Sequence, residues 1–430
     1  MNWLQWPESL KISWLSSGCK SPRTGTGYAN RFPSVVTLRE TAGQPMPPFR
    51  SALLYSPFFD SFNFGSDHPF KIHRNRLAYD LMNGYGLLNL PDMQIRECCP
   101  VSDELLLTFH DPDYIARLKE FSISEEARAD FRFGLGDADC PVFKGMFDYA
   151  VRGVGATFEA VRLVEEEGYD VAFNMNGGWH HAHRAKASGF SYLNDAAVAI
   201  NWLIARGRRV LYLDIDAHHG DGVQEAFYDT DQVLTLSIHE SGIYFYPGTG
   251  FENETGEGRG TGYCVNVPLL AHTDDAIYMK AFDEVAYPLI AAFNPDIIVT
   301  QIGADTFRTD PLTNLEITTH SYGEILKKIK RLKIPWVALG GGGYDLMNTA
   351  RAWTLAWAVM NDVTLDPRLP SEFIAMIEPL GYQNRVLLDA QHWAEEGERT
   401  LALAAVEKCI ASIKRDIFPG ILGSYGTPSS

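Results

Sequence analysis

Short apolar runs alternate with helical patterns through the central part of the chain. Five runs are short, apolar and often β-branched, which is typical of strands buried on both faces of a sheet. They cover residues 171–174, 209–216, 233–239, 296–303 and 335–339. Apolar residues at helical spacing predict helices over residues 194–206, 273–293 (open to a kink at Pro288), 321–332 and 348–360. This alternation predicts an α/β fold with a parallel sheet and helices on both of its faces.

The two ends of the chain follow a different pattern. Ser, Thr, Gly and Pro punctuate residues 1–50 without a persistent apolar period, which predicts a loose or disordered extension. We expect one large domain over residues 51–364, because α/β folds often exceed the roughly 150 residues of an average domain. Residues 365–430 are expected to add helices that pack on this domain, followed by a loose tail.

Composition and charge narrow the class of partner. The net charge of −17 disfavours binding to nucleic acid, because an acidic surface repels phosphate. The same charge suits cationic partners such as lysine-bearing peptides or amines, although it also serves solubility. The six cysteines form no CxxC pair, which disfavours a disulfide scaffold or a cysteine zinc site. With neither a long apolar run nor a secretory signal, we expect a cytoplasmic protein without a membrane segment.

The densest polar motif, DIDAHHGDG over residues 214–222, ends the apolar run at 209–216. In extended chain, alternate side chains share a face, so Asp214, Asp216 and His218 are predicted to point the same way. A carboxylate and an imidazole two residues apart offer two ligands to a metal ion. The alternative is a hydrogen-bonded turn, for which Asp and Gly are also favoured. Three acids and two histidines in this segment exceed what a turn needs.

Two further motifs supply histidines and a third acid. His180 and His181 follow a Gly-Gly bend after the run at 171–174, and nearby carboxylates could hold each of them. A histidine in isolation is more often structural. Asp305 follows the run at 296–303 and could be a third metal ligand or simply a helix N-cap.

The last motif is a run of four glycines, residues 340–343, followed by Tyr344. It is not a phosphate-binding loop, because no Lys-Ser/Thr follows and the GxGxxG spacing is absent. Asp216, His218 and Asp305 together offer two oxygens and one nitrogen to a divalent ion, and three protein ligands leave the open position of a catalytic zinc site. Metal-activated water beside a histidine base is hydrolytic chemistry, to which Tyr344 could add a hydrogen bond for a developing oxyanion.

These motifs, GGWHHA, ASGFSYLNDAA, LYLDIDAHHGDGVQEAF, YPGTG, GADTFRTDPL and GGGGY, occur in one order between about Leu53 and Met360. In that order they resemble the zinc-dependent histone deacetylase superfamily, and within it the bacterial acetoin-utilization-type deacetylases. The resemblance implies the arginase–deacetylase fold, an open parallel sheet of eight strands flanked by helices.

The resemblance also implies the roles of the site residues. One zinc ion would be held by Asp216, His218 and Asp305. His181 would be the general base, oriented by Asp221. His180, paired with Asp214, would act as an electrostatic or acid partner. The carbonyl of the acetyl group would be polarised by Tyr344.

Structural potassium ions are expected from the same resemblance. The first would use backbone oxygens of Asp214, Asp216 and His218 together with Ser237. A second, less firmly matched, would lie near Phe227, Thr230 and Val233.

The family binds the acylated lysine in a tunnel with two aromatic walls. Phe190, which follows Gly189, matches one wall, and Tyr246 stands where the other is usually Phe. Leu312 matches the apolar residue of lysine deacetylases, where polyamine deacetylases carry an acid. Asp139 matches the acid at the rim that grips the substrate backbone, although the segment around it is one residue longer than in many relatives.

Three functions therefore compete. The first is hydrolytic removal of acetyl or other acyl groups from lysine side chains in proteins or peptides. The second is hydrolysis of acetylpolyamines or other small acylated amines by the same fold, which Leu312 disfavours. The third is a non-catalytic binding protein, which is disfavoured because all three metal ligands and Tyr344 are present. An arginase-like site for two manganese ions would need more aspartates around the His-Asp motif.

Overall fold

The structure is a computed structural model that describes residues 49–123 and 128–423. The extension predicted for residues 1–50 lies almost entirely outside the described residues, as does the end of the tail after residue 423.

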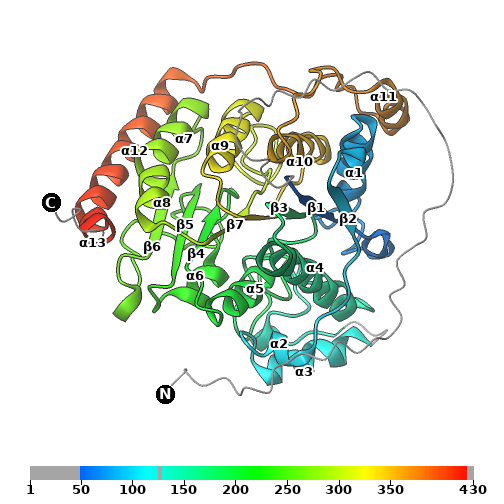
Figure 1. The fold of residues 1–430 in the computed structure, drawn as a ribbon, viewed down its shortest axis with the longest axis horizontal. Coiled ribbons are helices and arrows are strands. Elements are labelled where there is room, and N and C mark those ends of the chain that lie inside the picture. The colour runs from blue at the N-terminus through cyan, green and yellow to red at the C-terminus, as the bar shows by residue number, and fades with distance from the viewer. Residues whose placement is uncertain (1–48, 124–127, 424–430) are drawn as a thin grey trace, which may run out of the picture. The chain divides into compact units, whose positions relative to one another are not determined.

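The described residues form an eight-stranded sheet in which all neighbouring strands are parallel (Figure 1). The strand order is β2-β1-β3-β8-β7-β4-β5-β6. The strands are β1 (Ser51–Leu54), β2 (Met93–Arg96), β3 (Val171–Asn174), β4 (Val210–Asp214), β5 (Val233–Glu240), β6 (Cys264–Leu269), β7 (Ile297–Gln301) and β8 (Trp336–Leu339). This confirms the predicted open parallel sheet. The five predicted strands are β3, β4, β5, β7 and β8.

Helices cover both faces of the sheet. Their bounds are α1 (Arg74–Gly84), α2 (Asp103–Leu106), α3 (Pro112–Ser122), α4 (Met146–Glu167), α5 (Asp195–Ile204), α6 (Asp221–Phe227), α7 (Asp275–Ala281), α8 (Tyr287–Phe293), α9 (Thr319–Arg331), α10 (Leu346–Met360), α11 (Ser371–Ile377), α12 (Glu396–Asp416) and α13 (Phe418–Gly423). Alternate residues of β4 enter different cores: Leu211 and Leu213 pack on the side of α1 and α10, and Val210 and Tyr212 on the side of α4 and α5. Burial on both faces explains why the central strands have continuous apolar sequences.

The long helix predicted over residues 273–293 is divided in the structure. It comprises α7, a π-helical turn over Phe282–Ala286, and α8, in which Pro288 lies in the first turn. Proline has no N–H to donate, so the chain places it where a helical hydrogen bond is not required. Beyond the sheet, α12 packs against β6 and α7, and α13 packs against α8.

The strand order brings the polar motifs together. Strands β3, β8, β7 and β4 are consecutive neighbours, and Asn174 and Gln301 both pair with Leu339 at their carboxyl ends, while Asp214 pairs with Gln301. The loops that follow these four strands contain the two histidine-rich motifs, Asp305 and the glycine run. All four loops therefore leave the sheet at one level, on the edge where ligands bind in open α/β sheets.

Candidate active site

Three buried side chains form a candidate metal centre at this edge. Asp216 and His218 come from the loop after β4, and Asp305 comes from the loop after β7. His218 Nδ1 lies 3.1 Å from Asp216 Oδ1 and 3.0 Å from Asp305 Oδ2. One ligand atom from each residue lies within 4.8 Å of the others. The structure thus brings together the three residues that the sequence placed around a metal ion.

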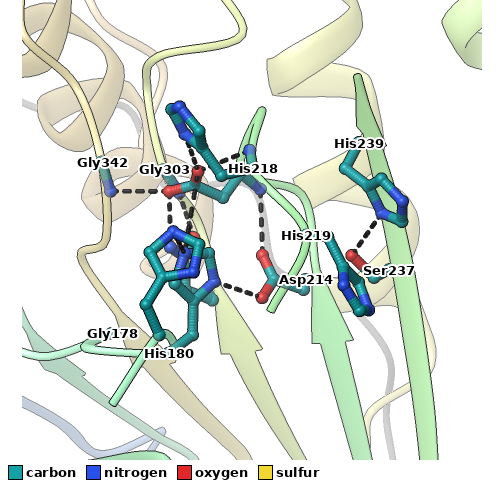
Figure 2. Close-up of polar contacts among 12 residues, drawn as sticks. Gly178, His180, Asp214, His218, His219, Ser237, His239, Gly303 and Gly342 are labelled. Atoms are coloured by element: carbon teal, nitrogen blue, oxygen red, sulfur yellow. Dashed lines mark hydrogen bonds and ion pairs between the residues drawn. The ribbon is translucent and has the colours of Figure 1, made fainter. Parts of the chain in front are cut away.

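Asp214 does not join this group, contrary to the prediction that it shares a face with Asp216 and His218. Strand β4 ends at Asp214, so the alternation of side chains stops there. The Asp214 carboxylate instead accepts a hydrogen bond from His180 Nδ1 at 2.7 Å (Figure 2). It accepts another from the Tyr212 hydroxyl at 2.8 Å. The two neighbouring carboxylates of this motif therefore serve different groups.

The donor set and its electrostatics fit a divalent cation. Burial, followed by the charge of Asp216, raises the pKa of Asp305 to about 8. A cation between the two carboxylates would remove this repulsion, and two oxygens with one imidazole nitrogen are ligands that zinc accepts. The carboxylates are also oriented from outside: Gln301 Nε2 and the Gly342 amide donate to Asp216 Oδ2 at 2.5 and 2.7 Å. Such outer partners fix the ligands in place.

Two adjacent histidines stand beside the candidate metal centre, and their pKa values shift in opposite directions. Burial opposes charge on His180, but Asp214 and Asp216 outweigh it and raise its pKa to about 9. Burial and the neighbouring His180 cation lower the pKa of His181 to about 4. These shifts favour the charged form of His180 and the neutral form of His181. The His181 Nδ1–H donates to Asp221 Oδ1 at 2.8 Å, so its Nε2 is the acceptor nitrogen, and it lies 3.0 Å from His180 Nε2, which donates to it when His180 is charged.

Asp221 is shared with a third histidine that the sequence reading left out. His183 Nε2 lies 3.4 Å from Asp221 Oδ2, and His183 Nδ1 contacts Glu225. Hydrogen bonds to Asp221 and Glu225 raise the pKa of His183 to about 9. His183 is part of the HHAH sequence at residues 180–183, but the neighbouring sequence does not indicate that it reaches Asp221, the carboxylate bonded to His181.

The glycine run places Tyr344 against the metal centre. A Cβ at Gly342 would overlap the Asp305 carboxylate, and Gly341 and Gly343 have φ angles of +86° and +131°. Only glycine meets both demands. Burial raises the pKa of Tyr344 well above its usual value, so its hydroxyl stays protonated and available as a donor.

Arg74 of α1 supports this loop and was missed by the sequence reading. Its guanidinium donates to the carbonyl oxygens of Gly343 at 2.7 Å and Gly341 at 2.5 Å. It also lies over the rings of Phe70 and Trp353. No local pattern in α1 indicates these contacts, which span most of the chain.

The aromatic residues predicted to bind substrate lie around the same centre. The Phe190 ring is 5.7 Å from that of Tyr344, and the Tyr246 ring is 5.0 Å from that of His181. The Tyr246 hydroxyl is hydrogen-bonded to the Ser188 hydroxyl at 2.6 Å. Phe190, Gly189, the two histidines, Asp216 and Tyr344 help to line a cavity of about 280 Å³, which includes its opening to solvent.

Gly189 is required beside His181, because a Cβ there would overlap the His181 ring. Phe245, which the sequence reading passed over, stacks on His218 with ring centroids 4.7 Å apart. The segment in which Tyr246 was predicted to form one aromatic wall thus contributes two rings, those of Phe245 and Tyr246.

Asp139 and Leu312 are linked to the site through intermediate residues: Asp139 through His68 to Phe190, and Leu312 through Asp310 to Tyr344. The Asp139 carbonyl accepts from His68, whose ring is 4.6 Å from Phe190, and burial raises the pKa of the Asp139 carboxyl. The Leu312 amide donates to Asp310, whose other oxygen accepts from the Tyr344 amide.

The residues expected to bind potassium lie in two places. His239 Nε2 donates to the Gly250 carbonyl at 2.9 Å, and burial lowers the pKa of His239 well below its usual value. Its Nδ1 is then an acceptor for the Ser237 hydroxyl at 2.8 Å (Figure 2), which leaves the lone pairs of the Ser237 oxygen for a cation.

The second predicted group, Phe227, Thr230 and Val233, spans the connection from the end of α6 to the start of β5. The Phe227 carbonyl there accepts a long hydrogen bond, 3.4 Å, from the Thr230 amide.

The parallel sheet and the buried His–Asp cluster at its edge define an α/β protein with a candidate metal centre. Over residues 68–360 the chain matches the histone deacetylase domain. It is 38% identical over 330 residues to the histone deacetylase RPD3 of Saccharomyces cerevisiae, covering 76% of this chain and 75% of the yeast protein. It is 40% identical over 332 residues to the acetoin utilization protein AcuC of Bacillus subtilis, covering 75% and 85%. The chain belongs to the histone deacetylase family, a family of generally metal-dependent hydrolases.

Solved structures agree with this assignment. A crystal structure of an HDAC homolog from Aquifex aeolicus matches with a TM-score of 0.75 at 30% identity, covering 84% of this chain and 100% of the other. An HDAC homolog complexed with SAHA matches with a TM-score of 0.76 at 30% identity and the same coverage. These findings confirm the family resemblance and the fold.

Within residues 49–123 and 128–423, no helix is both long enough and apolar enough to cross a membrane.

Proposed function

We propose that this protein is a zinc-dependent hydrolase that removes acetyl or other acyl groups from the side-chain amine of lysine in proteins or peptides. The observation that carries the proposal is the buried triad of Asp216, His218 and Asp305 beside Tyr344 and two histidines whose pKa values shift in opposite directions. The triad would hold the zinc ion, which supplies Lewis acidity and activates water for hydrolysis.

The two histidines divide the proton chemistry. Neutral His181 presents Nε2 to accept a proton from the attacking water, and Asp221 holds its other nitrogen and stabilises the charge that forms. His180 is already charged and held by Asp214, so it provides positive charge beside the reacting centre and a proton for the departing amine. The opposite pKa shifts of these neighbours support this division of roles.

Tyr344 is placed to polarise the acyl carbonyl. Its hydroxyl stays neutral, and its ring lies edge-on to His218 with centroids 6.4 Å apart. A preorganised donor of this kind stabilises the oxyanion that develops when an amide is attacked.

The walls of the site support an acylated lysine as substrate. Phe190 and Tyr246 would pack on the apolar stem of the lysine, and an aromatic tunnel disfavours the charged, deacylated form. Leu312 supplies no acid that would select a polyamine. The net charge of −17 suits cationic peptides and not nucleic acid. We therefore expect a peptide substrate, gripped at the rim by Asp139, and no nucleic-acid or membrane partner.

The proposal also includes structural potassium ions and a cytoplasmic location. Structural potassium ions would bind at the carbonyl oxygens of Asp214, Asp216 and His218 with the Ser237 hydroxyl, and near the α6–β5 connection. Cys98, Cys140, Cys264 and Cys409 are thiols rather than disulfides, which supports a reducing cytoplasmic location.

The test is lysine release from acetyl-lysine and longer acyl-lysine peptides, with acetylpolyamines in parallel. It is run with zinc, after chelation, and with Tyr344→Phe. Tyr244→Phe is the matched control, because Tyr244 is 99% exposed. We expect zinc-dependent turnover that falls about 10²–10³-fold in Tyr344→Phe and is unchanged in the control. Turnover of acetylpolyamines alone would overturn the lysine assignment, and a zinc-loaded protein inactive on every substrate would overturn the hydrolase.

A further inference from the structure

Asp310 is a buried carboxylate that joins two loops of the candidate active site. It lies in the loop after β7, which also contains the candidate metal ligand Asp305, and only 6% of the residue is exposed. Its Oδ1 accepts the Leu312 amide of the same loop at 3.0 Å. Its Oδ2 accepts the amides of Tyr344 at 2.7 Å and Asp345 at 3.2 Å, which belong to the loop after β8. One carboxylate therefore holds the metal-ligand loop and the glycine loop together.

The carboxylate of Asp310 is held by amide donors and not by a cation. In the described part of the chain, no lysine or arginine forms an ion pair with it. Burial raises the pKa of Asp310 to about 6, and the amides of Tyr344, Leu312 and Asp345 oppose that rise. A buried charge is costly unless it is hydrogen-bonded, so these three amides are what keep the carboxylate in its place.

The sequence before Tyr344 explains why this residue needs a restraint from outside its own loop. Residues 340–343 are all glycine, the residue type with the greatest freedom of the backbone. The Gly342 amide donates to Asp216 at 2.7 Å, which fixes the run beside the candidate metal centre but not at its end. Asp310 accepts the amide of Tyr344 itself, and so fixes the backbone from which the tyrosine side chain extends.

A second contact connects the same two loops to a helix. The Thr309 hydroxyl donates to Asp345 Oδ2 at 3.2 Å and accepts from Asn348 Nδ2 at 2.7 Å. The Asp345 side chain caps the first turn of α10, and α10 is buried along most of its length. Because a buried helix is rigid compared with a loop, these contacts give the residues around Asp310 a fixed frame.

We propose that Asp310 is a positioning residue, which holds Tyr344 and Leu312 in one fixed geometry relative to the candidate metal centre. The inference rests on the proposed function, which assigns the oxyanion to Tyr344 and a place beside the substrate to Leu312. Asp310 acts through the backbone of these two residues and not by contact with the substrate. Its loss should therefore affect turnover through Tyr344 and substrate binding through Leu312.

The test uses two variants of the full-length chain. Asp310→Ala removes all three acceptors, and Asp310→Asn keeps one acceptor oxygen and is the milder change if the alanine variant does not fold. The matched control is Asp275→Asn. Asp275 also accepts a backbone amide from a distant segment, that of Thr318 at 2.8 Å, but it lies in the first turn of α7 and contacts none of the candidate catalytic residues.

Hydrogen exchange of the metal-free chain tests the contact without any turnover. Exchange is followed by mass spectrometry of the peptide that contains Tyr344, because an amide bonded to a buried carboxylate exchanges only when that bond opens. We expect exchange at Tyr344 about 10-fold faster in Asp310→Ala, a smaller increase in Asp310→Asn, and none in Asp275→Asn. Equal exchange in the wild type and both Asp310 variants would overturn the proposal.

Kinetics on an acetyl-lysine peptide then separate the two residues that Asp310 holds. We expect Asp310→Ala to retain its zinc, to lower kcat about 10²-fold, and to raise KM about 5-fold. In Asp310→Asn, kcat should fall about 10-fold, and Asp275→Asn should match the wild type. In a Tyr344→Phe background, Asp310→Ala should leave kcat unchanged and still raise KM, because Leu312 is released in either background.

Two outcomes of the kinetics would overturn the proposal. One is a loss of kcat that multiplies with that of Tyr344→Phe, because Asp310 would then act independently of the tyrosine. The other is a loss of bound zinc in Asp310→Asn, which would place the effect at the metal ligands. A zinc-loaded wild type that turns over no acyl-lysine peptide would instead overturn the proposed function, and hydrogen exchange would still decide whether Asp310 holds Tyr344.

Discussion

Replacing Arg74 is the most informative perturbation outside the candidate catalytic residues. Its side chain is 2% exposed, and its two hydrogen bonds hold the carbonyls of Gly341 and Gly343 immediately before Tyr344. Burial lowers the pKa of Arg74, and among the described residues no carboxylate pairs with it. We expect that Arg74 positions Tyr344 and does not itself meet the substrate.

The size of the effect follows from opposing contributions. Two charged hydrogen bonds contribute about 1.5–3 kcal/mol each, so Arg74→Met would lose about 3–6 kcal/mol. Removing a buried cation returns several kcal/mol of desolvation cost, because methionine fills similar space without charge. Stability should therefore fall by only about 2 kcal/mol. The rate should fall more clearly, since a misplaced group at the reacting centre costs about 10²-fold.

The assay is steady-state turnover of an acetyl-lysine peptide, with urea unfolding to measure stability. The matched control is Arg76→Met, from the same helix, because Arg76 is largely exposed and pairs with Asp80. We expect a kcat about 10²-fold lower in Arg74→Met with little change in KM, and no change in the control. Arg74→Lys should resemble Arg74→Met, because lysine keeps the charge but cannot donate as a fork to both carbonyls.

A double-mutant cycle with Tyr344→Phe decides whether Arg74 acts through that residue. If it does, the double variant should be no slower than Tyr344→Phe alone, because the misplaced hydroxyl is already gone. Independent losses that multiply in the double variant, or normal kcat in Arg74→Met, would refute the reasoning.

Two further experiments test other parts of the site. His183 has a pKa raised to about 9, so its contribution to stability is complete below about pH 6.5 and is lost as the pH rises through 9. Allowing for its partial exposure, that contribution is about 1 kcal/mol. His180 titrates over the same range in both proteins, so urea unfolding from pH 6 to 9.5 should show a loss of stability about 1 kcal/mol larger in the wild type than in His183→Gln. Gly342→Ala should abolish zinc binding at the candidate catalytic centre, because its Cβ would overlap the Asp305 carboxylate, whereas Gly397→Ala in open space on α12 should stabilise the chain by up to about 1 kcal/mol. Normal zinc content in Gly342→Ala would contradict the close packing of the glycine loop against Asp305.

The fold was predictable where the sequence carries a strong periodic signal. Strands β3, β4, β5, β7 and β8 are buried on both faces, so each appears as a short apolar run. Edge strand β2 is partly exposed and contains Gln94 and Arg96, and edge strand β6 contains Asn266 and Pro268. Neither has the continuous apolar sequence of a central strand. Strand β1 was missed as well, although it lies between β2 and β3 and is buried at all four positions, so an edge position does not by itself explain the omissions.

The contents of the candidate site were predictable from short motifs, but its assembly was not. Each motif directly follows a strand, so it was legitimate to expect all of them at one edge of the sheet. Which motifs become neighbours depends on the order of the strands in the sheet. Strand β8 lies between β3 and β7 although it is the last strand in the sequence. Arg74 reaches the glycine loop across 267 residues of chain, a contact that no local pattern encodes.

The different roles of Asp214 and Asp216 show where periodicity stops being a guide. Alternation predicted one shared face for both carboxylates, and it holds only while the backbone remains in the sheet. Beyond Asp214 the chain turns, with the Asp216 amide bonded to the Asp214 carboxylate at 3.1 Å and the His218 amide to that of Asp216 at 2.9 Å. Aspartate favours such turns because its short side chain can accept a hydrogen bond from the backbone two residues later. The same residue type that offers a charge to the site therefore also bends the chain, and this bend directs one carboxylate to His180 and the other to the metal centre.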